Sequence, residues 1–267
     1  MSAASAYEIT VGGHLDDRWS AWFGGVKIRR NDDHTTTLTA PLADQAQLHG
    51  LLAGLRDVNA PLVSLRSPAP GCRPVLTRPL RTDRLTLRNA GPTDTEPTWA
   101  FRQLPSVNEW LTGCPDTLDG YRELFTRPGR LATTVVVEIA GGAVIGDFML
   151  RREDAWGQVE PAGSARGRQA ELGWVLDPAH TGHGYATEAV RGLLRHCFEE
   201  LGVRRVVATC FLANDSSWRL LERVGMRRET HAVRESLHRS GEWLDTVGYA
   251  ILDDEWPRSA AQRPDGS

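Results

Sequence analysis

The order of apolar and polar residues divides the chain into two patterned stretches with a proline-rich segment between them. In the first stretch, residues 7–66, Tyr7, Ile9 and Val11 alternate with polar residues, as in a half-buried strand. The elements predicted after this strand are a helix at 17–23, strands at 26–30 and 35–39, a helix from Pro41 to Leu55 and a strand at 62–65. The order β-α-β-β-α-β predicts a small ferredoxin-like α+β domain. No group of catalytic residues stands out in it, and we expect a docking or ligand-sensing module.

Two segments lack such a pattern and set the domain boundaries. Residues 67–79 have the composition of a linker stiffened by proline, with Pro68, Pro70, Gly71, Pro74 and Pro79. Residues 257–267 are small and polar and are predicted to be disordered. We therefore expect an N-terminal domain at 1–66 and a larger domain at 80–256.

Strand and helix patterns alternate in the larger domain, which predicts an α/β fold with helices flanking a sheet. The strands are predicted near 85–87 and at 133–139, 144–150, 171–176, 203–210 and 246–252, and the helices at 94–104, 184–201 and 216–224. The apolar run Val206-Val207-Ala208 is typical of a central strand. The polar stretch 151–169 is predicted to be a mobile connection close to a functional site.

Composition and charge narrow the possible functions. The chain has 267 residues, 40% of them hydrophobic, and a net charge of −3, so no overall positive field attracts nucleic acid or anionic lipid. No run of about 18 apolar residues is present, and the first residues lack the basic and apolar parts of a signal peptide. The four cysteines show no paired spacing and are expected to be reduced thiols. We expect a cytoplasmic protein that binds neither nucleic acid nor membranes.

The turn Thr181–Ala186, between a strand and a long amphipathic helix, has the features of an anion site. The first amides of a helix have no backbone partner, and the helix dipole adds partial positive charge there. Gly182 and Gly184 carry no side chain, so a diphosphate can approach the amides. The alternative is a tight turn without a ligand. Against it stand the small residues that follow the turn and the polar segment Asn214–Ser217 at the same end of the sheet.

Dinucleotide, P-loop and metal sites fit the sequence less well. A Rossmann site requires G-x-G-x-x-G/A, but Thr187 stands at the third position and no acidic residue follows about 20 positions later. No G-x-x-x-x-G-K-S/T sequence of a P-loop is present. His180, His183 and His196 lack a carboxylate at ligand spacing, so we expect no metal.

Four pieces in the same order give the chain from Leu80 to Trp256 a resemblance to the GNAT acetyltransferases, specifically to the RimJ/RimL-like branch that acetylates N-terminal amines of ribosomal proteins. They are Leu80–Arg88, Glu171–Pro178, His180–Ala189, and Asn214–Ser217 with Leu220–Met226. The first two look like strands of that branch. The third looks like its acetyl-CoA pyrophosphate loop and the fourth like its closing N-x-x-S…G motif.

The resemblance implies a GNAT fold, in which a mixed central sheet flanked by helices splays after the strand 171–176. It also implies acetyl-CoA as cosubstrate, with the pantetheine arm against the backbone of Trp174, Val175 and Leu176, which supply an N–H for the thioester oxygen. The pyrophosphate is then expected on the turn formed by Thr181, Gly182, His183, Gly184, Tyr185, Ala186 and Thr187. Asn214 and Ser217 are expected beside the pantetheine.

Catalysis is expected to rest on Glu171 and Ser217. An amine must be neutral to attack, and an α-amine, with a pKa near ~8, loses its proton more readily than a lysine, near ~10.4. Glu171 is the predicted general base, acting through water, and a solvated strand carboxylate is its alternative. Leu221 stands where many family members carry an acid tyrosine. Ser217 matches the serine of RimL-like members, and its alternative is the N-cap of the last helix. Thr181 replaces the usual Gln or Arg, so one phosphate donor is shorter or missing.

Two functions follow from these residues. The first is an acetyl-CoA-dependent N-acetyltransferase, monomeric or homodimeric, which acetylates a primary amine of a protein N-terminus, a lysine or a small molecule by direct attack. The second is a catalytically inactive acyl-CoA-binding module that signals through the N-terminal domain. The residues 99–127 and 151–169 are expected to shape the acceptor pocket.

Overall fold

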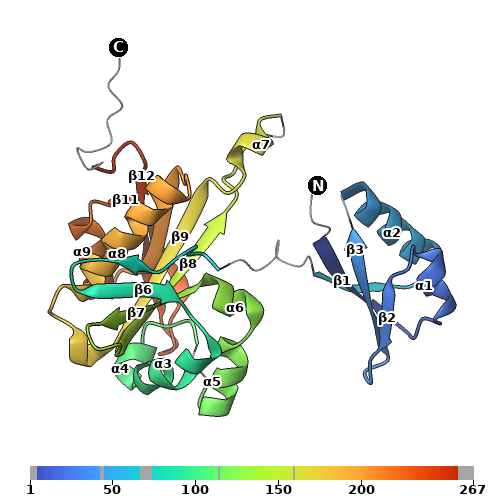
Figure 1. Ribbon diagram of the computed structural model, residues 1–267, viewed down its shortest axis with the longest axis horizontal. Helices are drawn as coiled ribbons and strands as arrows, with labels where there is room; N and C mark the ends of the chain where they lie inside the picture. The colour runs from blue at the N-terminus through green and yellow to red at the C-terminus, as the bar shows by residue number, and fades with distance from the viewer. Residues whose placement is uncertain (1–4, 43–44, 67–73, 114, 159, 258–267) are drawn as a thin grey trace. The chain divides into compact units, whose positions relative to one another are not determined.

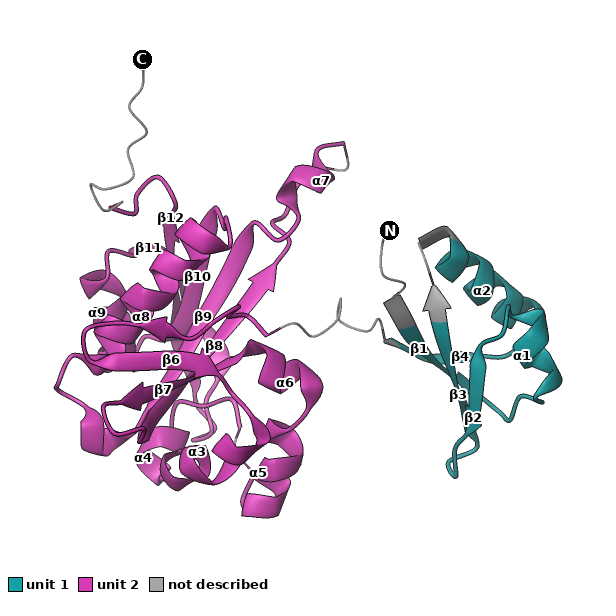
Figure 2. Ribbon diagram, viewed as in Figure 1, with its two compact units in different colours: residues 1–73 teal, residues 74–267 magenta. Residues whose placement is uncertain are grey.

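The computed structural model describes residues 5–42, 45–66, 74–113, 115–158 and 160–257. The chain divides into two compact units, unit 1 (Met1–Arg73) and unit 2 (Pro74–Ser267), shown in different colours in Figure 2. The predicted tail at 258–267 and the first part of the predicted linker, 67–73, lie outside the described residues. The rest of that linker belongs to unit 2, because the amide of Val75 donates to Ala132 (3.2 Å) and Leu76 is buried.

Unit 1 has its six elements in the predicted order. They are β1 (Ser5–Gly12), α1 (Arg18–Trp22), β2 (Lys27–Arg30), β3 (Thr35–Leu42), α2 (Gln45–Asp57) and β4 (Leu62–Arg66) (Figure 1). The sheet order β2-β3-β1-β4, antiparallel throughout, is that of a ferredoxin-like unit. Ile9, Val11 and Leu38 form its core with α2.

The predicted start of the second helix of unit 1 is wrong. Pro41 lies in β3, opposite Ala6 of β1, and α2 begins only at Gln45. The neighbour on the other side, β2, pairs with β3 no farther than Thr39. Proline has no N–H to donate, and here it stands where only one edge of its strand is paired, so a strand position is tolerated.

Unit 2 is built on one eight-stranded sheet of order β11-β12-β10-β9-β8-β7-β6-β5. The strands are β5 (Leu80–Arg81), β6 (Leu85–Asn89), β7 (Thr134–Ile139), β8 (Val144–Glu153), β9 (Gln169–Leu176), β10 (Arg205–Phe211), β11 (Arg227–Leu237) and β12 (Trp243–Leu252). Only β9 and β10 are parallel, so the sheet is mixed as expected. β10 lies between β9 and β12, which confirms the central strand.

Helices cover both faces of this sheet (Figure 1). On one face lie η1 (Pro92–Asp94), α3 (Thr95–Arg102), α4 (Pro105–Asn108), α5 (Leu118–Phe125) and α6 (Pro128–Thr133). On the other lie α8 (Tyr185–Arg195), continued by the π-helical turn η3 (His196–Glu200), and α9 (Asp215–Arg223). The short α7 (Ala162–Ala165) joins β8 to β9, and η2 (Pro178–His180) follows β9. Within the described ranges, no helix combines the length and apolar character that crossing a membrane requires.

The sheet opens between its two parallel strands. β9 pairs with β10 only at Gln169, Ala170 and Glu171, opposite Arg205 to Val207. Beyond Glu171, β9 remains paired with β8 as far as Leu176, and β10 remains paired with β12 as far as Phe211. The predicted splay is therefore present, and it leaves one edge of β9 open from Leu172 onward in the described sheet.

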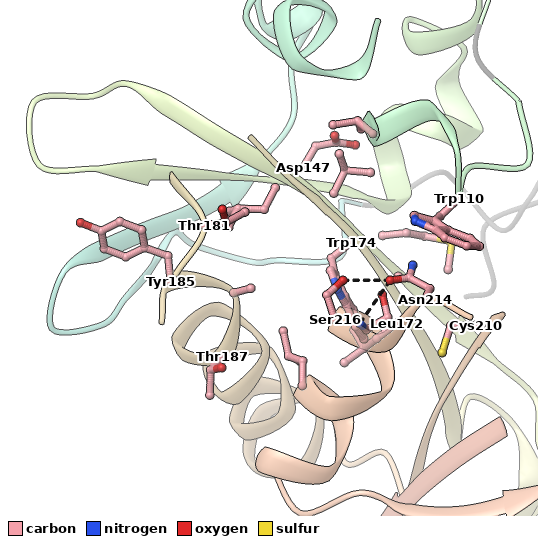
Figure 3. Close-up of a pocket in the computed structure, with 18 of the residues that line it drawn as sticks. Trp110, Asp147, Leu172, Trp174, Thr181, Tyr185, Thr187, Cys210, Asn214 and Ser216 are labelled. Carbon is pink, nitrogen blue, oxygen red and sulfur yellow. Dashed lines mark hydrogen bonds between the residues drawn. The ribbon is translucent and has the colours of Figure 1, made fainter. Parts of the chain in front are cut away.

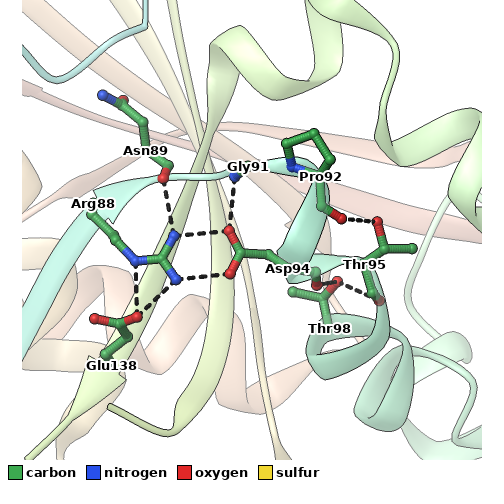
Figure 4. Close-up of polar contacts among 8 residues, drawn as sticks. All are labelled: Arg88, Asn89, Gly91, Pro92, Asp94, Thr95, Thr98 and Glu138. Carbon is green, nitrogen blue, oxygen red and sulfur yellow. Dashed lines mark hydrogen bonds and ion pairs between the residues drawn. The ribbon is translucent and has the colours of Figure 1, made fainter.

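A charged network fixes the first helices against the sheet (Figure 4). Arg88 of β6 donates two hydrogen bonds to Asp94 (2.7 and 2.8 Å) and one to Glu138 of β7 (2.8 Å). Asp94 also accepts from the amide of Gly91 (2.7 Å) and is only 3% exposed. Because Asp94 precedes α3, this network sets the direction in which α3 leaves the sheet.

We expect Asp94→Asn to destabilise the protein, because the buried side chain at position 94 then lacks the charge that pairs with Arg88. The expected loss is about 2–3 kcal/mol of unfolding free energy, at the lower end for a broken ion pair because Arg88 is partly exposed. The midpoint of urea unfolding, followed by circular dichroism, measures it. The control is Asp119→Asn, which removes an exposed partner of Arg122 and is expected to leave the midpoint unchanged.

Candidate functional site

An open cavity of about 2320 Å³ follows the gap between β9 and β10 (Figure 3). It is lined by residues 172–176 of β9, residues 209–211 of β10 and the first turns of α8 and α9. Residues of the segment 99–127 also line it, as expected. Of the predicted stretch 151–169, Arg151 lines the cavity, whereas the described residues between 154 and 168 do not, so the prediction holds only for the start of that stretch. That connection leads into the amino end of β9, whereas the cavity lies along the carboxyl half of the strand.

The turn before α8 presents unpaired amides to this cavity. Gly182 and Gly184 have φ angles of +80° and +79°, left-handed values that favour glycine. No hydrogen bond between described residues uses the amides of residues 182–187 as donors; the first helical bond runs from the amide of Glu188 to Gly184. Six of the seven predicted loop residues line the cavity, and His183 does not. The turn therefore combines free donors with the positive end of the α8 dipole.

Arg84, which sequence analysis did not single out, holds this turn in place. Its guanidinium donates to the carbonyl oxygen of His183 (2.9 Å) and lies over the ring of Tyr185, 4.6 Å from the centroid. It also pairs with Glu188 of α8 (2.7 Å), which accepts a further bond from Thr82 (2.5 Å). Burial opposes the charged form of Glu188, but the bonds from Thr82 and Arg84 outweigh it and lower the pKa of Glu188.

Further arginines of α8 and α9 make this end of the cavity basic. Arg191, Arg195, Arg219 and Arg223 all line it. Arg223 donates to the hydroxyl of Thr187 (3.3 Å), and Arg191 donates to the carbonyl oxygen of Arg223 (3.1 Å). Arg191 is one helical turn after Thr187, so its place could have been read from spacing. Arg219 and Arg223 come together with α8 only through the fold.

Asn214 and Ser217 lie at the start of α9 and line the cavity. Figure 3 shows Asn214 beside Trp174 of β9. The side-chain oxygen of Asn214 accepts from the amide of Ser217 (3.4 Å) and from the hydroxyl of Ser216 (2.8 Å). Asn214 is thus the N-cap of α9, and the alternative that gave this role to Ser217 is wrong. A side chain at the cap must precede the helix, whereas Ser217 lies in its first turn. Leu221 is fully buried in the core.

Two other predicted residues have partners of their own. The hydroxyl of Thr181 donates to the carbonyl oxygen of Pro178 (2.9 Å), so it is already engaged within the turn. Glu171 lines the cavity and forms an ion pair with Arg151, its cross-strand neighbour on β8. Glu171 stands at the last paired position of β9 and β10, where the gap between them begins.

The model of the acetyltransferase (GNAT) domain matches residues 84–227, more than half of the chain. The chain belongs to the GNAT acetyltransferase family. Members of this family use acetyl-CoA. A second model, the domain of unknown function DUF8691, matches residues 6–66.

Individual relatives of this chain include proteins named as N-acetyltransferases, one of them putatively ribosomal. It is 40% identical over 86 residues to the uncharacterized N-acetyltransferase YnaD of Bacillus subtilis, covering 32% of this chain and 50% of that protein. It is 36% identical over 89 residues to the putative ribosomal N-acetyltransferase YdaF of the same organism, covering 33% and 48%. The chain thus spans about half the length of these curated relatives. The structure of Mycobacterium smegmatis RimJ in complex with CoA-disulfide matches its fold with a TM-score of 0.56 and 24% identity, over 71% of this chain and 94% of that chain.

Gly184→Glu is expected to weaken binding of CoA at least a hundredfold, because it places a carboxylate where the free amides face the cavity and strains a left-handed position. Isothermal titration with CoA measures the effect. Gly241→Glu is the matched control, since Gly241 has a similar φ of +86° with nothing within 4 Å of an added Cβ. Tight CoA binding by Gly184→Glu would remove the turn from the site.

Proposed function

We propose that this protein transfers the acetyl group of acetyl-CoA to a primary amine by direct attack. The observation that carries the proposal is the set of unpaired amides at 182–187 beside the open edge of β9. In this arrangement the pyrophosphate lies on the amides of residues 182 and 184–187. The arginines around it supply further positive charge. Thr181 has a shorter side chain than the usual Gln or Arg, and its hydroxyl already donates to Pro178. The backbone amides are therefore the main donors of the loop.

The pantetheine arm then extends along β9 as an added strand. Its amides pair with backbone groups of Trp174, Val175 and Leu176, and Asn214 lies beside it. This placement directs the thioester toward Glu171, where β9 and β10 begin to part. A backbone N–H of β9 stabilises the negative charge that develops on the thioester oxygen.

The chemistry needs one proton acceptor and one proton donor. The amine nitrogen attacks the thioester carbon, its proton passes through water to Glu171, and the C–S bond breaks. The departing thiolate takes a proton from the hydroxyl of Ser217, which lies in the first turn of α9. Ser217 then regains a proton from solvent water, and Glu171 releases its proton to solvent. Cys210 lines the same cavity, but burial raises the pKa of its thiol to about 11, so it is protonated at neutral pH and a poor nucleophile. This supports direct attack over an acyl-enzyme route.

Release of free thiol from acetyl-CoA, measured over a panel of α-amines, lysine peptides and small amines, tests the activity itself. We expect release that depends on one class of amine. The second candidate, an acyl-CoA-binding regulatory module, is favoured by Leu221, which is buried where other members carry a tyrosine. It predicts thermal stabilisation by CoA with no thiol released on any amine.

Glu171→Gln is expected to lower kcat about a hundredfold at neutral pH while changing the acetyl-CoA KM little, because it removes the proton acceptor and not a cofactor contact. Glu153→Gln is the matched control, since Glu153 contacts the same guanidinium, Arg151 (2.7 Å), from β8. Steady-state rates between pH 6 and 9 distinguish the two variants. An unchanged rate for Glu171→Gln across that range would exclude Glu171 from the mechanism.

Ser217→Ala is expected to lower kcat about tenfold with acetyl-CoA. The loss is expected to be smaller with acyl donors whose departing thiol is more acidic than that of CoA. Ser216→Ala controls for the loss of a hydroxyl at the same helix end, where Ser216 supports the cap through Asn214. Equal effects of the two substitutions would assign Ser217 a structural role only.

A further inference from the structure

Two arginines where α8 meets α9 have no carboxylate partner. Arg191 of α8 donates through Nη2 to the carbonyl oxygen of Arg223, the last residue of α9 (3.1 Å). Arg223 donates through Nη1 to the hydroxyl of Thr187 of α8 (3.3 Å). Within the described part of the chain neither arginine forms an ion pair, and both line the cavity. The carbonyl end of α9 holds the guanidinium of Arg191 in place, but it carries only a partial negative charge.

The other charged residues on this side of the cavity occur as pairs of opposite sign. They are Arg84 and Glu188, Arg219 and Asp215, Arg195 and Glu199, and Arg81 and Asp83. The first two are ion pairs, with distances of 2.7 and 2.9 Å, and the last two cancel in charge. Arg191 and Arg223 therefore leave two positive charges without a balancing charge.

Both guanidiniums lie close to the unpaired amides that precede and begin α8. Arg223 contacts Thr187, whose own amide is one of these donors. Arg191 follows Thr187 by four residues, and helical side chains lean toward the amino end of their helix, so Arg191 covers the same turn. A guanidinium has five N–H donors, and the described hydrogen bonds use one of each arginine. The remaining donors are available to an anion that lies next to the amides.

We propose that Arg191 and Arg223 bind the ribose 3′-phosphate of CoA and thereby select CoA over dephospho-CoA. This inference rests on the proposed function, in which the pyrophosphate lies on the amides of residues 182 and 184–187. One ribose joins that pyrophosphate to the 3′-phosphate, so a cation site next to the amides is within reach of it. A phosphate monoester carries a charge of about −1.5 to −2 at pH 7, which two unpaired guanidiniums balance. Its terminal oxygens accept the paired hydrogen bonds that arginine donates.

Binding to the full chain tests the proposal without turnover. Isothermal titration with CoA and with dephospho-CoA compares two ligands that differ only in the 3′-phosphate. We expect CoA to bind about twentyfold more tightly, a modest preference because both arginines are exposed and screened by salt. Arg191→Gln and Arg223→Gln are each expected to weaken CoA about fivefold and to leave dephospho-CoA unchanged. Arg191→Lys keeps the charge and is expected to retain most of the preference.

Arg204→Gln is the matched control, since Arg204 is also exposed and lies outside the cavity. It removes the same charge and is expected to change neither affinity. Equal affinities of the unaltered protein for the two ligands would overturn the proposal. Loss of affinity for both ligands in Arg191→Gln and Arg223→Gln would also overturn it, because these arginines would then serve the pyrophosphate or the packing of α9.

The same titrations separate this inference from the proposed function. A preference for CoA that both Gln variants reduce supports the 3′-phosphate site, even if no amine releases thiol from acetyl-CoA. Thiol release with equal affinities for CoA and dephospho-CoA supports the acetyltransferase and overturns the 3′-phosphate site. Failure of both ligands to bind would overturn both proposals.

Discussion

The separation of β9 from β10 after Glu171 is the constraint on which the rest of the site depends. Buried backbone N–H and C=O groups need partners, so two neighbouring strands rarely part inside a sheet. Here β9 remains paired with β8 and β10 with β12, so the missing hydrogen bonds are confined to one side of each strand. The open edge extends from Leu172 to Leu176, next to the turn at 181–187. Backbone groups of the strand edge and of the helix start, which have no partner among the described residues, therefore line the same cavity.

One hydrophobic core spans the gap between the two strands. One core cluster contains residues of β8, β9 and β10 together with Leu193 of α8 and Leu220 and Leu221 of α9. Strands on both sides of the gap and both helices therefore belong to a single core. Leu221 is fully buried in this core, which gives a physical reason for an aliphatic residue at this position. Glu188, bonded to Thr82 and Arg84, ties α8 to the start of the domain.

Much of the candidate site could be predicted from sequence, because the turn before α8 and the start of α9 are local motifs. The glycine turn, the amphipathic α8 and the N-x-x-S segment each occupy a continuous stretch, and each lies where its pattern placed it. β11 was missed because it is an edge strand with mostly exposed side chains, which leaves no alternation of apolar residues to detect. Arg84 was missed because its role depends on a contact with His183, 99 residues away. Most of the stretch 151–169 was misplaced, because composition does not show to which end of β9 it leads.

The alternation of side chains along β9 explains why the cofactor could be inferred and the acceptor could not. Leu172 and Trp174 belong to the face packed under α8. Glu171, Gly173 and Val175 point to the opposite face, whose chemistry is completed by β8 and by α3 and α6. Asp147, for example, is paired with Arg102, which lies 45 residues away in the sequence. A single strand thus separates a face next to continuous sequence motifs from a face whose contacts are made by residues far apart in the sequence.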